Sequence, residues 1–105
     1  MKRIGFQFSI RQDRLEEYKR LHEAVWPEML EALRKAGWHN YTLFLREDGL
    51  VFGTFETDVD LQTAQARMAA TEVNTRWQEF MAPFTASSDR PDSGFVELEE
   101  YFHLD

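Results

Sequence analysis

The chain has 105 residues, a formal net charge of −7 and no cysteine; 43% of its residues are hydrophobic and 14% are aromatic. Domains usually run to about 100–200 residues, so we expect residues 1–105 to fold as a single domain. The negative charge repels phosphate backbones and anionic lipids, which argues against nucleic acid and membranes as partners, and the lack of cysteine excludes disulfide bonds and thiol catalysis.

The N-terminal part of the chain changes from a strand period to a helical one. Residues 4–10 are apolar at every second position, which predicts a strand. From about Asp13, which can serve as an N-cap, the helical period runs on as far as Trp26. Pro27 disfavours helical geometry at the residue before it, yet it suits the first position of a second helical segment, which Gly37 closes. We therefore expect a long helix that is kinked or broken between Trp26 and Pro27.

The rest of the chain predicts a hairpin, further helices and a last strand. Residues 38–46 and 50–57 are rich in aromatic and β-branched side chains and are joined by the turn EDG, as in a β-hairpin. Asp58 and Thr71 are the candidate caps of the helical pieces that follow. In chain order, the remaining elements are helical pieces over 60–70 and 72–84, a polar loop over 85–94, and a strand over 95–104.

The resulting order, βαββαβ, predicts an α+β fold of the ferredoxin-like type, an antiparallel sheet with its helices on one face. The other face of such a sheet is usually polar, but residues 50–57 and 95–104 carry apolar side chains on both faces. Apolar surface on both faces implies that both are covered, and a second copy of the chain is the simplest cover. We therefore expect a homodimer, with either Phe55 or Phe95, whichever faces outward, in its interface.

Most familiar chemistries lack their motifs. The three histidines are far apart and form no HxxxH or HExxH pattern, so we expect no metal. Glycines do not cluster into a phosphate loop, and the acidic residues Glu97, Glu99 and Glu100 in the last strand argue against RNA. Ser87 and Ser88 lie in a polar loop without a GxSxG motif, so a serine nucleophile has no support.

The location is predicted from two absences. No stretch approaches the roughly 20 apolar residues of a membrane span. The N-terminus, MKRIGFQFSIRQ, lacks the apolar run of about 7–15 residues that a secretory signal requires. We therefore expect a cytoplasmic protein.

Acid–base chemistry has a candidate in the first helix. Tyr18, His22 and Trp26 are spaced four apart and so share one helical face. Such a stripe is often ordinary core packing. Here, however, Leu15, Leu21 and Val25 are available for the core, so the aromatic stripe is equally compatible with the wall of a site.

Four segments of the chain resemble the L-rhamnose mutarotase family. The most specific are E-x-Y-x-x-x-H-x-x-x-W-P-E and an H-N-Y triplet that follows a glycine by two positions, and the resemblance extends over essentially the whole chain. The four segments are EEYKRLHEAVWPEM (16–29), GWHNYTLFL (37–45), TRWQEFM (75–81) and LEEYFHL (98–104).

The resemblance implies a fold, an activity and a set of site residues. It implies a dimeric ferredoxin-like α+β barrel, an isomerase that interconverts the α and β anomers of L-rhamnose without a cofactor. It also implies that His22 is the proton donor and that Tyr18 and Tyr41 contact the sugar. Trp77 matches the first of two adjacent tryptophans that contact the sugar in the family. Gln78 occupies the second position and departs from the pattern, so we expect it to bind substrate differently.

The reaction suits these residue types. Ring opening needs an acid at the ring oxygen and a base at the anomeric hydroxyl, and histidine can exchange protons near neutral pH. Aromatic faces can cover the C–H groups of a sugar while tyrosine hydroxyls bind its polar groups. Two alternatives remain open: a cofactor-free or haem-degrading monooxygenase, which the same barrel architecture also hosts, and a sugar-binding module without catalysis.

Overall fold

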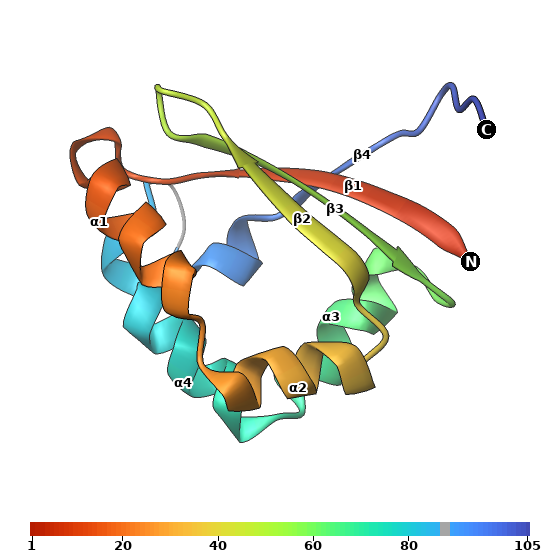
Figure 1. Ribbon diagram of the computed structural model, residues 1–105, viewed down its shortest axis with the longest axis horizontal. Helices are drawn as coiled ribbons and strands as arrows, with labels where there is room; N and C mark the ends of the chain where they lie inside the picture. The colour runs from red at the N-terminus through yellow and green to blue at the C-terminus, as the bar shows by residue number, and fades with distance from the viewer. Residues whose placement is uncertain (87–88) are drawn as a thin grey trace.

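The protein forms two layers, a sheet and a set of helices that cover one of its faces (Figure 1). The computed structural model describes residues 1–86 and 89–105, so Ser87 and Ser88 lie outside it. Its strands are β1 (Lys2–Ser9), β2 (His39–Leu45), β3 (Leu50–Thr57) and β4 (Val96–Leu98). Its α-helices are α1 (Leu15–Leu21), α2 (Pro27–Lys35), α3 (Leu61–Ala69) and α4 (Glu72–Met81), and its 3₁₀ helices are η1 (Gln12–Arg14), η2 (His22–Ala24), η3 (Ala82–Phe84) and η4 (Pro91–Gly94).

The four strands lie in the order β2-β3-β1-β4, and all neighbours are antiparallel. Together with the order of the helices, this topology confirms the predicted ferredoxin-like α+β fold. The register aligns one residue of each strand in a row on the face that no helix covers. This outer row consists of Phe44, Phe52, Gln7 and Val96.

The predicted break in the first helical region is confirmed. Trp26 has extended backbone angles (φ −55°, ψ 133°), and Pro27 is the first residue of α2. Gly37 follows the end of α2 with a φ of 87°, the left-handed conformation expected of a helix-terminating glycine. Asp13 is not an N-cap: it lies inside η1, where its carboxylate accepts two hydrogen bonds from Arg11.

The two later helices confirm one predicted cap and correct the other. Thr71 caps α4 by accepting a hydrogen bond from the backbone of Asn74. The cap of α3 is Asp60, which accepts from Thr63, and not Asp58. Asp58 lies two residues before this cap, and its carboxylate pairs instead with Arg67 at 3.1 Å.

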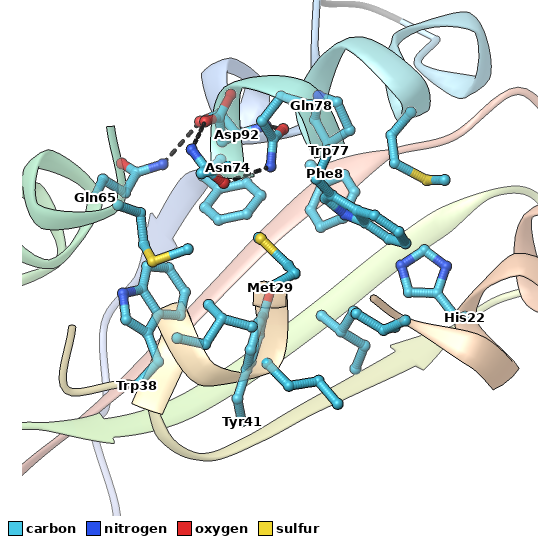
Figure 2. Close-up of a pocket in the computed structure, with 18 of the residues that line it drawn as sticks. Phe8, His22, Met29, Trp38, Tyr41, Gln65, Asn74, Trp77, Gln78 and Asp92 are labelled. Carbon is cyan, nitrogen blue, oxygen red and sulfur yellow. Dashed lines mark hydrogen bonds between the residues drawn. The ribbon is translucent and has the colours of Figure 1, made fainter. Parts of the chain in front are cut away.

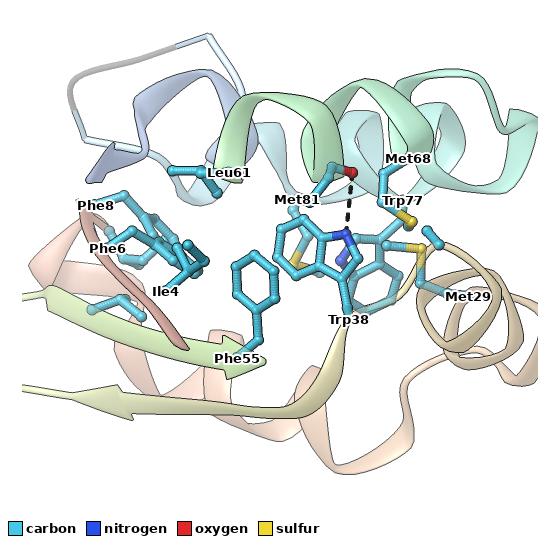
Figure 3. Close-up of a cluster of buried hydrophobic side chains, with 14 of the residues drawn as sticks. Ile4, Phe6, Phe8, Met29, Trp38, Phe55, Leu61, Met68, Trp77 and Met81 are labelled. Atoms are coloured by element: carbon cyan, nitrogen blue, oxygen red, sulfur yellow. Dashed lines mark hydrogen bonds between the residues drawn. The ribbon is translucent and has the colours of Figure 1, made fainter. Parts of the chain in front are cut away.

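The core fills the space between the sheet and the helices, as Figure 3 shows. Phe6 is fully buried, and Trp38 stacks on Phe55 with ring centroids 4.0 Å apart. The indole of Trp38 donates a hydrogen bond to the carbonyl of Ala64. Phe95 stacks on Phe6 at 4.0 Å. Phe55 and Phe95 therefore both face inward. The prediction that one of them lies on the outer surface is wrong.

The last strand is shorter than predicted. Strand β4 comprises only Val96–Leu98 and pairs with β1 at Gly5–Gln7. The predicted strand over 95–104 is therefore wrong beyond Leu98, because the tail leaves the sheet and finds no further strand to pair with (Figure 1). Three apolar side chains of this tail are 91%, 74% and 80% exposed: Tyr101, Phe102 and Leu104.

Candidate functional site

A cavity of about 320 Å³ lies between the inner face of the sheet and helices α1, α2 and α4. This volume is at the lower end of the roughly 300–1,000 Å³ that small-molecule sites occupy. Figure 2 shows four of the predicted site residues in its wall, namely His22, Tyr41, Trp77 and Gln78, and Tyr18 lines it as well. Its apolar lining consists of Phe8, Val25, Met29, Leu30, Leu33, Trp38, Leu43, Met68, Met81, Pro91 and Phe95.

His22 lies at the end of α1 with one ring nitrogen already engaged. Its Nδ1 is 2.9 Å from the backbone carbonyl of Tyr18, and because a carbonyl only accepts, Nδ1 carries the proton in this bond. The ring of His22 also contacts Tyr18, with centroids 4.4 Å apart, and meets the Trp77 indole edge-on at 5.5 Å. Consequently Nε2 is the nitrogen that remains available for a ligand.

The surroundings of His22 favour its neutral form. Burial lowers the pKa of the imidazole below 6.5, and the hydrogen bond to the Tyr18 carbonyl offsets only part of that effect. At neutral pH the ring is therefore uncharged, with a proton on Nδ1 and a lone pair on Nε2.

Two tyrosines, Tyr18 and Tyr41, line the cavity with their hydroxyls in the protonated form. Burial raises the pKa of Tyr18 and also that of Tyr41, where the neighbouring Tyr18 and the charge of Asp92 raise it further. Among the residues that the structure describes, neither hydroxyl has a hydrogen-bond partner. Both are therefore free to donate to a ligand.

The aromatic stripe of Tyr18, His22 and Trp26 lies partly in the wall of the cavity and partly behind it. Tyr18 and His22 line the cavity, and Trp77 does so from α4. Trp26 does not line it; its indole packs edge-on against Trp77 at 5.0 Å and stacks on Phe80 at 5.4 Å. Trp26 thus holds Trp77 in place from behind.

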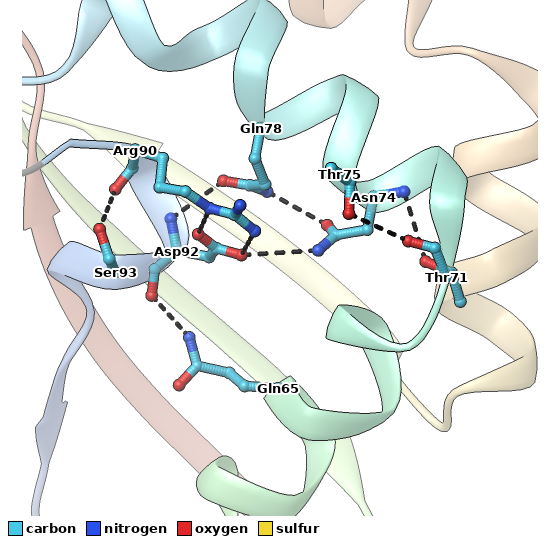
Figure 4. A network of polar contacts seen from close by, with 8 residues as sticks. All are labelled: Gln65, Thr71, Asn74, Thr75, Gln78, Arg90, Asp92 and Ser93. Atoms are coloured by element: carbon cyan, nitrogen blue, oxygen red, sulfur yellow. Dashed lines mark hydrogen bonds and ion pairs between the residues drawn. The ribbon is translucent and has the colours of Figure 1, made fainter.

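A group of hydrogen-bonded polar side chains forms another part of the wall (Figure 4). Gln78 donates to Asn74 and accepts from the backbone N–H of Asp92. Asn74 in turn donates to the Asp92 carboxylate, and Gln65 donates to the Asp92 carbonyl. These contacts tie α3 and α4 to η4.

All of the predicted site residues line the same cavity: His22, Tyr18, Tyr41, Trp77 and Gln78. Sequence reasoning missed Asn74, Asp92 and Gln65, which complete its polar part. Asn74 was hidden inside a predicted helix and Asp92 inside a predicted loop, and neither forms a motif with the other residues. No pattern in the chain pointed to them.

Two classes of site are not found in the described part of the chain. Residues 1–86 and 89–105 contain no group of three or more histidine or acidic side chains placed to hold a metal ion. Within the same ranges, the helices are all too short or too polar to cross a lipid bilayer.

Fold and cavity together define a class: a ferredoxin-like domain whose helices and sheet enclose a small-molecule site equipped for acid–base chemistry. The model of the family described as "L-rhamnose mutarotase" matches residues 3–104. The chain therefore belongs to the L-rhamnose mutarotase family. Membership confirms the resemblance seen in the sequence, and with it the prediction of an isomerase over a monooxygenase or a non-catalytic module.

Individual relatives agree with the family match. The chain is 39% identical to the L-rhamnose mutarotase of Oceanobacillus iheyensis over 108 residues and to that of Bacillus subtilis over 106, with all of each chain covered. The L-rhamnose mutarotase of Burkholderia cenocepacia is 38% identical over 108 residues, again over the full length of both chains. A crystal structure of the L-rhamnose mutarotase of Formosa agariphila superimposes with a TM-score of 0.83 at 24% identity, covering both chains completely, and shows the same fold.

Proposed function

We propose that this protein interconverts the α and β anomers of L-rhamnose, with His22 as the group that moves the proton. The observation that carries the proposal is the single free nitrogen of His22. In a chain of this family, Nδ1 is held by the Tyr18 carbonyl while Nε2 is left for a ligand beside an enclosed aromatic cavity.

The reaction requires only that a proton move from the anomeric hydroxyl to the ring oxygen. Nε2 of neutral His22 accepts the proton of the anomeric hydroxyl. The bond between C1 and the ring oxygen then breaks, and the imidazolium donates its proton to the ring oxygen. The product is the open-chain aldehyde and a regenerated neutral imidazole. Closure on the other face of the aldehyde, by the reverse steps, gives the other anomer. No electrons are transferred, so no cofactor is required.

Four further residues hold the sugar in this proposal. Tyr18 and Tyr41 donate hydrogen bonds from hydroxyls that have no partner within the described residues. The indole of Trp77 covers the C–H groups of the ring. Gln78 acts on the sugar through the polar part of the wall, which it ties together by its bonds to Asn74 and Asp92. Because water already opens the ring slowly, positioning the sugar beside one acid–base group is sufficient for catalysis.

The test is exchange between the two anomers, followed by NMR magnetisation transfer. With L-rhamnose and a catalytic amount of protein, cross-peaks between the two anomeric protons should grow faster than in buffer alone. A panel of other reducing sugars measures the substrate preference. Binding of L-rhamnose without faster exchange would mean a sugar-binding module, and turnover that consumes oxygen would mean a monooxygenase.

The proposal also includes a homodimer, formed by apposing the outer faces of two sheets. Its support is the outer row, in which Phe44, Phe52 and Val96 are 59%, 40% and 57% exposed, together with the apolar side chains of the C-terminal tail. We place the protein in the cytoplasm, consistent with a chain that contains no cysteine.

A further inference from the structure

The chain contains the pattern Arg-x-Asp three times, at residues 11–13, 46–48 and 90–92. In each case the guanidinium makes a two-pronged hydrogen bond to the carboxylate two positions later. Such a pair is an ordinary clamp for a loop. The side chains of Asp13 and Asp48 are 65% and 55% exposed, whereas that of Asp92 is only 21% exposed and lines the cavity.

Asp92 differs from the other two in its surroundings as well. Its Oδ1 accepts from Arg90 at 2.7 Å, and its Oδ2 accepts from Arg90 at 2.9 Å and from the amide of Asn74 at 3.5 Å. Its backbone N–H donates to Gln78 at 3.0 Å, and its carbonyl accepts from Gln65 at 2.8 Å. Few side chains at a loop need this many anchors, and together they fix the carboxylate in one orientation at the wall.

The group retains unused hydrogen-bonding capacity. A carboxylate offers about four acceptor positions, and three are occupied, so one position on Oδ1 remains. Asn74 and Gln78 each use one of two amide N–H donors in the contacts that the structure describes. Asp92 and Tyr41 line the same cavity.

Asp92 and His22 occupy separate parts of the cavity wall. Figure 2 shows His22 separated from Asn74 and Asp92, with the Trp77 indole adjacent to His22. The free acceptor of Asp92 and the free amide donor of Asn74 instead match a pair of sugar hydroxyls.

We propose that Asp92 is a specificity-determining residue that accepts a hydrogen bond from a non-anomeric hydroxyl of the sugar, and that Gln78 is a positioning residue that holds Asp92 for this contact. This rests on the proposed function, because the ligand is the same L-rhamnose. The proposal also explains why Gln78 departs from the tryptophan pair. In place of an aromatic contact with the sugar, its amide forms a hydrogen bond that positions the η4 segment.

The first experiment compares Asp92→Asn with the matched control Asp48→Asn in the intact protein. Both changes remove one charge from the same type of Arg-x-Asp clamp, but only Asp92 lines the cavity. Asp92→Asn should raise KM for L-rhamnose by about tenfold or more while kcat changes little, since the contact is present in both the ground and the transition state. Asp48→Asn should leave both parameters unchanged.

The second experiment identifies the contact with monodeoxy analogues of L-rhamnose lacking the hydroxyl at C2, C3 or C4. The wild type should bind one of these analogues more weakly than L-rhamnose. The Asp92→Asn variant should bind that analogue and L-rhamnose with the same affinity. An equal loss of affinity for L-rhamnose and every analogue, or equal behaviour of Asp92→Asn and Asp48→Asn, would show that Arg90 and Asp92 are only a loop clamp.

The third experiment tests the role of Gln78. Gln78→Leu removes both hydrogen bonds at similar size and should reproduce the rise in KM. If Gln78 acts through Asp92, adding Asp92→Asn to this variant should increase KM little further. Additive effects would assign Gln78 a separate contact and overturn the positioning role. Absence of any anomer exchange by the wild type would contradict the proposed function itself, an outcome distinct from these.

Discussion

At the scale of single residues, one hydrogen bond decides how His22 can act. A histidine with both nitrogens free can present either tautomer, but the Tyr18 carbonyl holds the proton on Nδ1. The lowered pKa then keeps Nε2 unprotonated at neutral pH. The imidazole therefore starts as a base, and it becomes a proton donor only after it has taken the proton of the anomeric hydroxyl.

Replacement of His22 tests this role directly. Losing one general acid–base group costs about 10²–10⁴ in rate, so His22→Ala should bring anomer exchange close to the uncatalysed rate. His39→Ala is the matched control, because His39 is exposed on β2 and does not line the cavity. Both variants should retain the wild-type circular dichroism spectrum. A His22→Ala variant with a lower Tm and an unchanged rate per folded molecule would make His22 a packing residue.

The pH dependence follows from the direction of the pKa shift. Because the neutral imidazole starts the reaction, the wild-type rate should rise with pH through an ionisation below 6.5 and reach a plateau above it. NMR exchange measured from pH 4.5 to 8 checks this. A rate that falls as pH rises through the same ionisation would mean that the imidazolium is the form that starts the reaction.

The same shift has a consequence for stability. As pH falls below about 6.5, the unfolded chain binds a proton at His22 before the folded chain does, so this group destabilises the fold progressively in that window and has no effect above it. His22→Asn removes the titrating group. As the pH is lowered from 7 to 5, the Tm of this variant should therefore rise relative to the Tm of the wild type.

The site could be predicted only as far as its residues follow a local pattern. Tyr18 and His22 are four apart on one helix, so their shared face is visible in the sequence. Asn74 and Asp92 meet at 3.5 Å only because α4 and η4 pack together, and an 18-residue separation carries no periodicity. Tertiary packing, which no local pattern records, supplied this part of the wall.

At the scale of elements, the packing of β3 against β1 depends on one missing side chain. Gly53 lies opposite Phe6 in the sheet, and a Cβ at this position would come within 2.4 Å of the Phe6 ring. Phe6 is fully buried among Phe8, Phe55 and Phe95, so the ring has no room to move away. The absence of a side chain on β3 thus lets the central aromatic residue of the core lie flat on the sheet.

Gly53→Ala should therefore destabilise the protein by about 1–3 kcal/mol, the usual cost of overpacking a core. For a domain of this size, each 1 kcal/mol lowers Tm by roughly 4–8 °C, which differential scanning calorimetry detects. Gly5→Ala is the control: it is also a strand glycine, but its Cβ would meet nothing closer than 3.7 Å. Equal Tm changes in the two variants would mean that strand propensity, and not the Phe6 ring, sets the effect.

The elements themselves could be predicted better than their ends. The hairpin, the break at Pro27 and the cap at Thr71 all follow from local chemistry, and all three are observed. The predicted cap of α3 lies two residues early, because Asp58 and Asp60 satisfy the same local rule, and only the structure shows that Asp60 accepts from Thr63 while Asp58 pairs with Arg67. The last strand was predicted too long because alternation in the tail says nothing about whether a neighbouring strand is present.

At the scale of the whole molecule, both faces of the sheet carry apolar side chains, but helices cover only one of them. Helices bury the inner face, while the outer row leaves Phe44, Phe52 and Val96 accessible. The rings of Phe44 and Phe52 lie 6.4 Å apart and form a continuous apolar strip. A monomer of 12.5 kDa rarely exposes such a strip together with an apolar tail, and a second copy with two-fold symmetry would cover both.

Phe52→Asp should separate the proposed dimer into monomers. In a two-fold interface the change occurs twice, so the loss of two buried phenylalanines costs about 3–6 kcal/mol and weakens association about 10²–10⁴-fold. Light scattering at micromolar concentration should give about twice 12.5 kDa for the wild type and a single chain mass for the variant. Phe80→Asp is the control, since Phe80 is 42% exposed, close to the 40% of Phe52, but lies on α4 away from the sheet face. A wild type that is monomeric, or a loss of dimer with Phe80→Asp alone, would exclude the outer row as the interface.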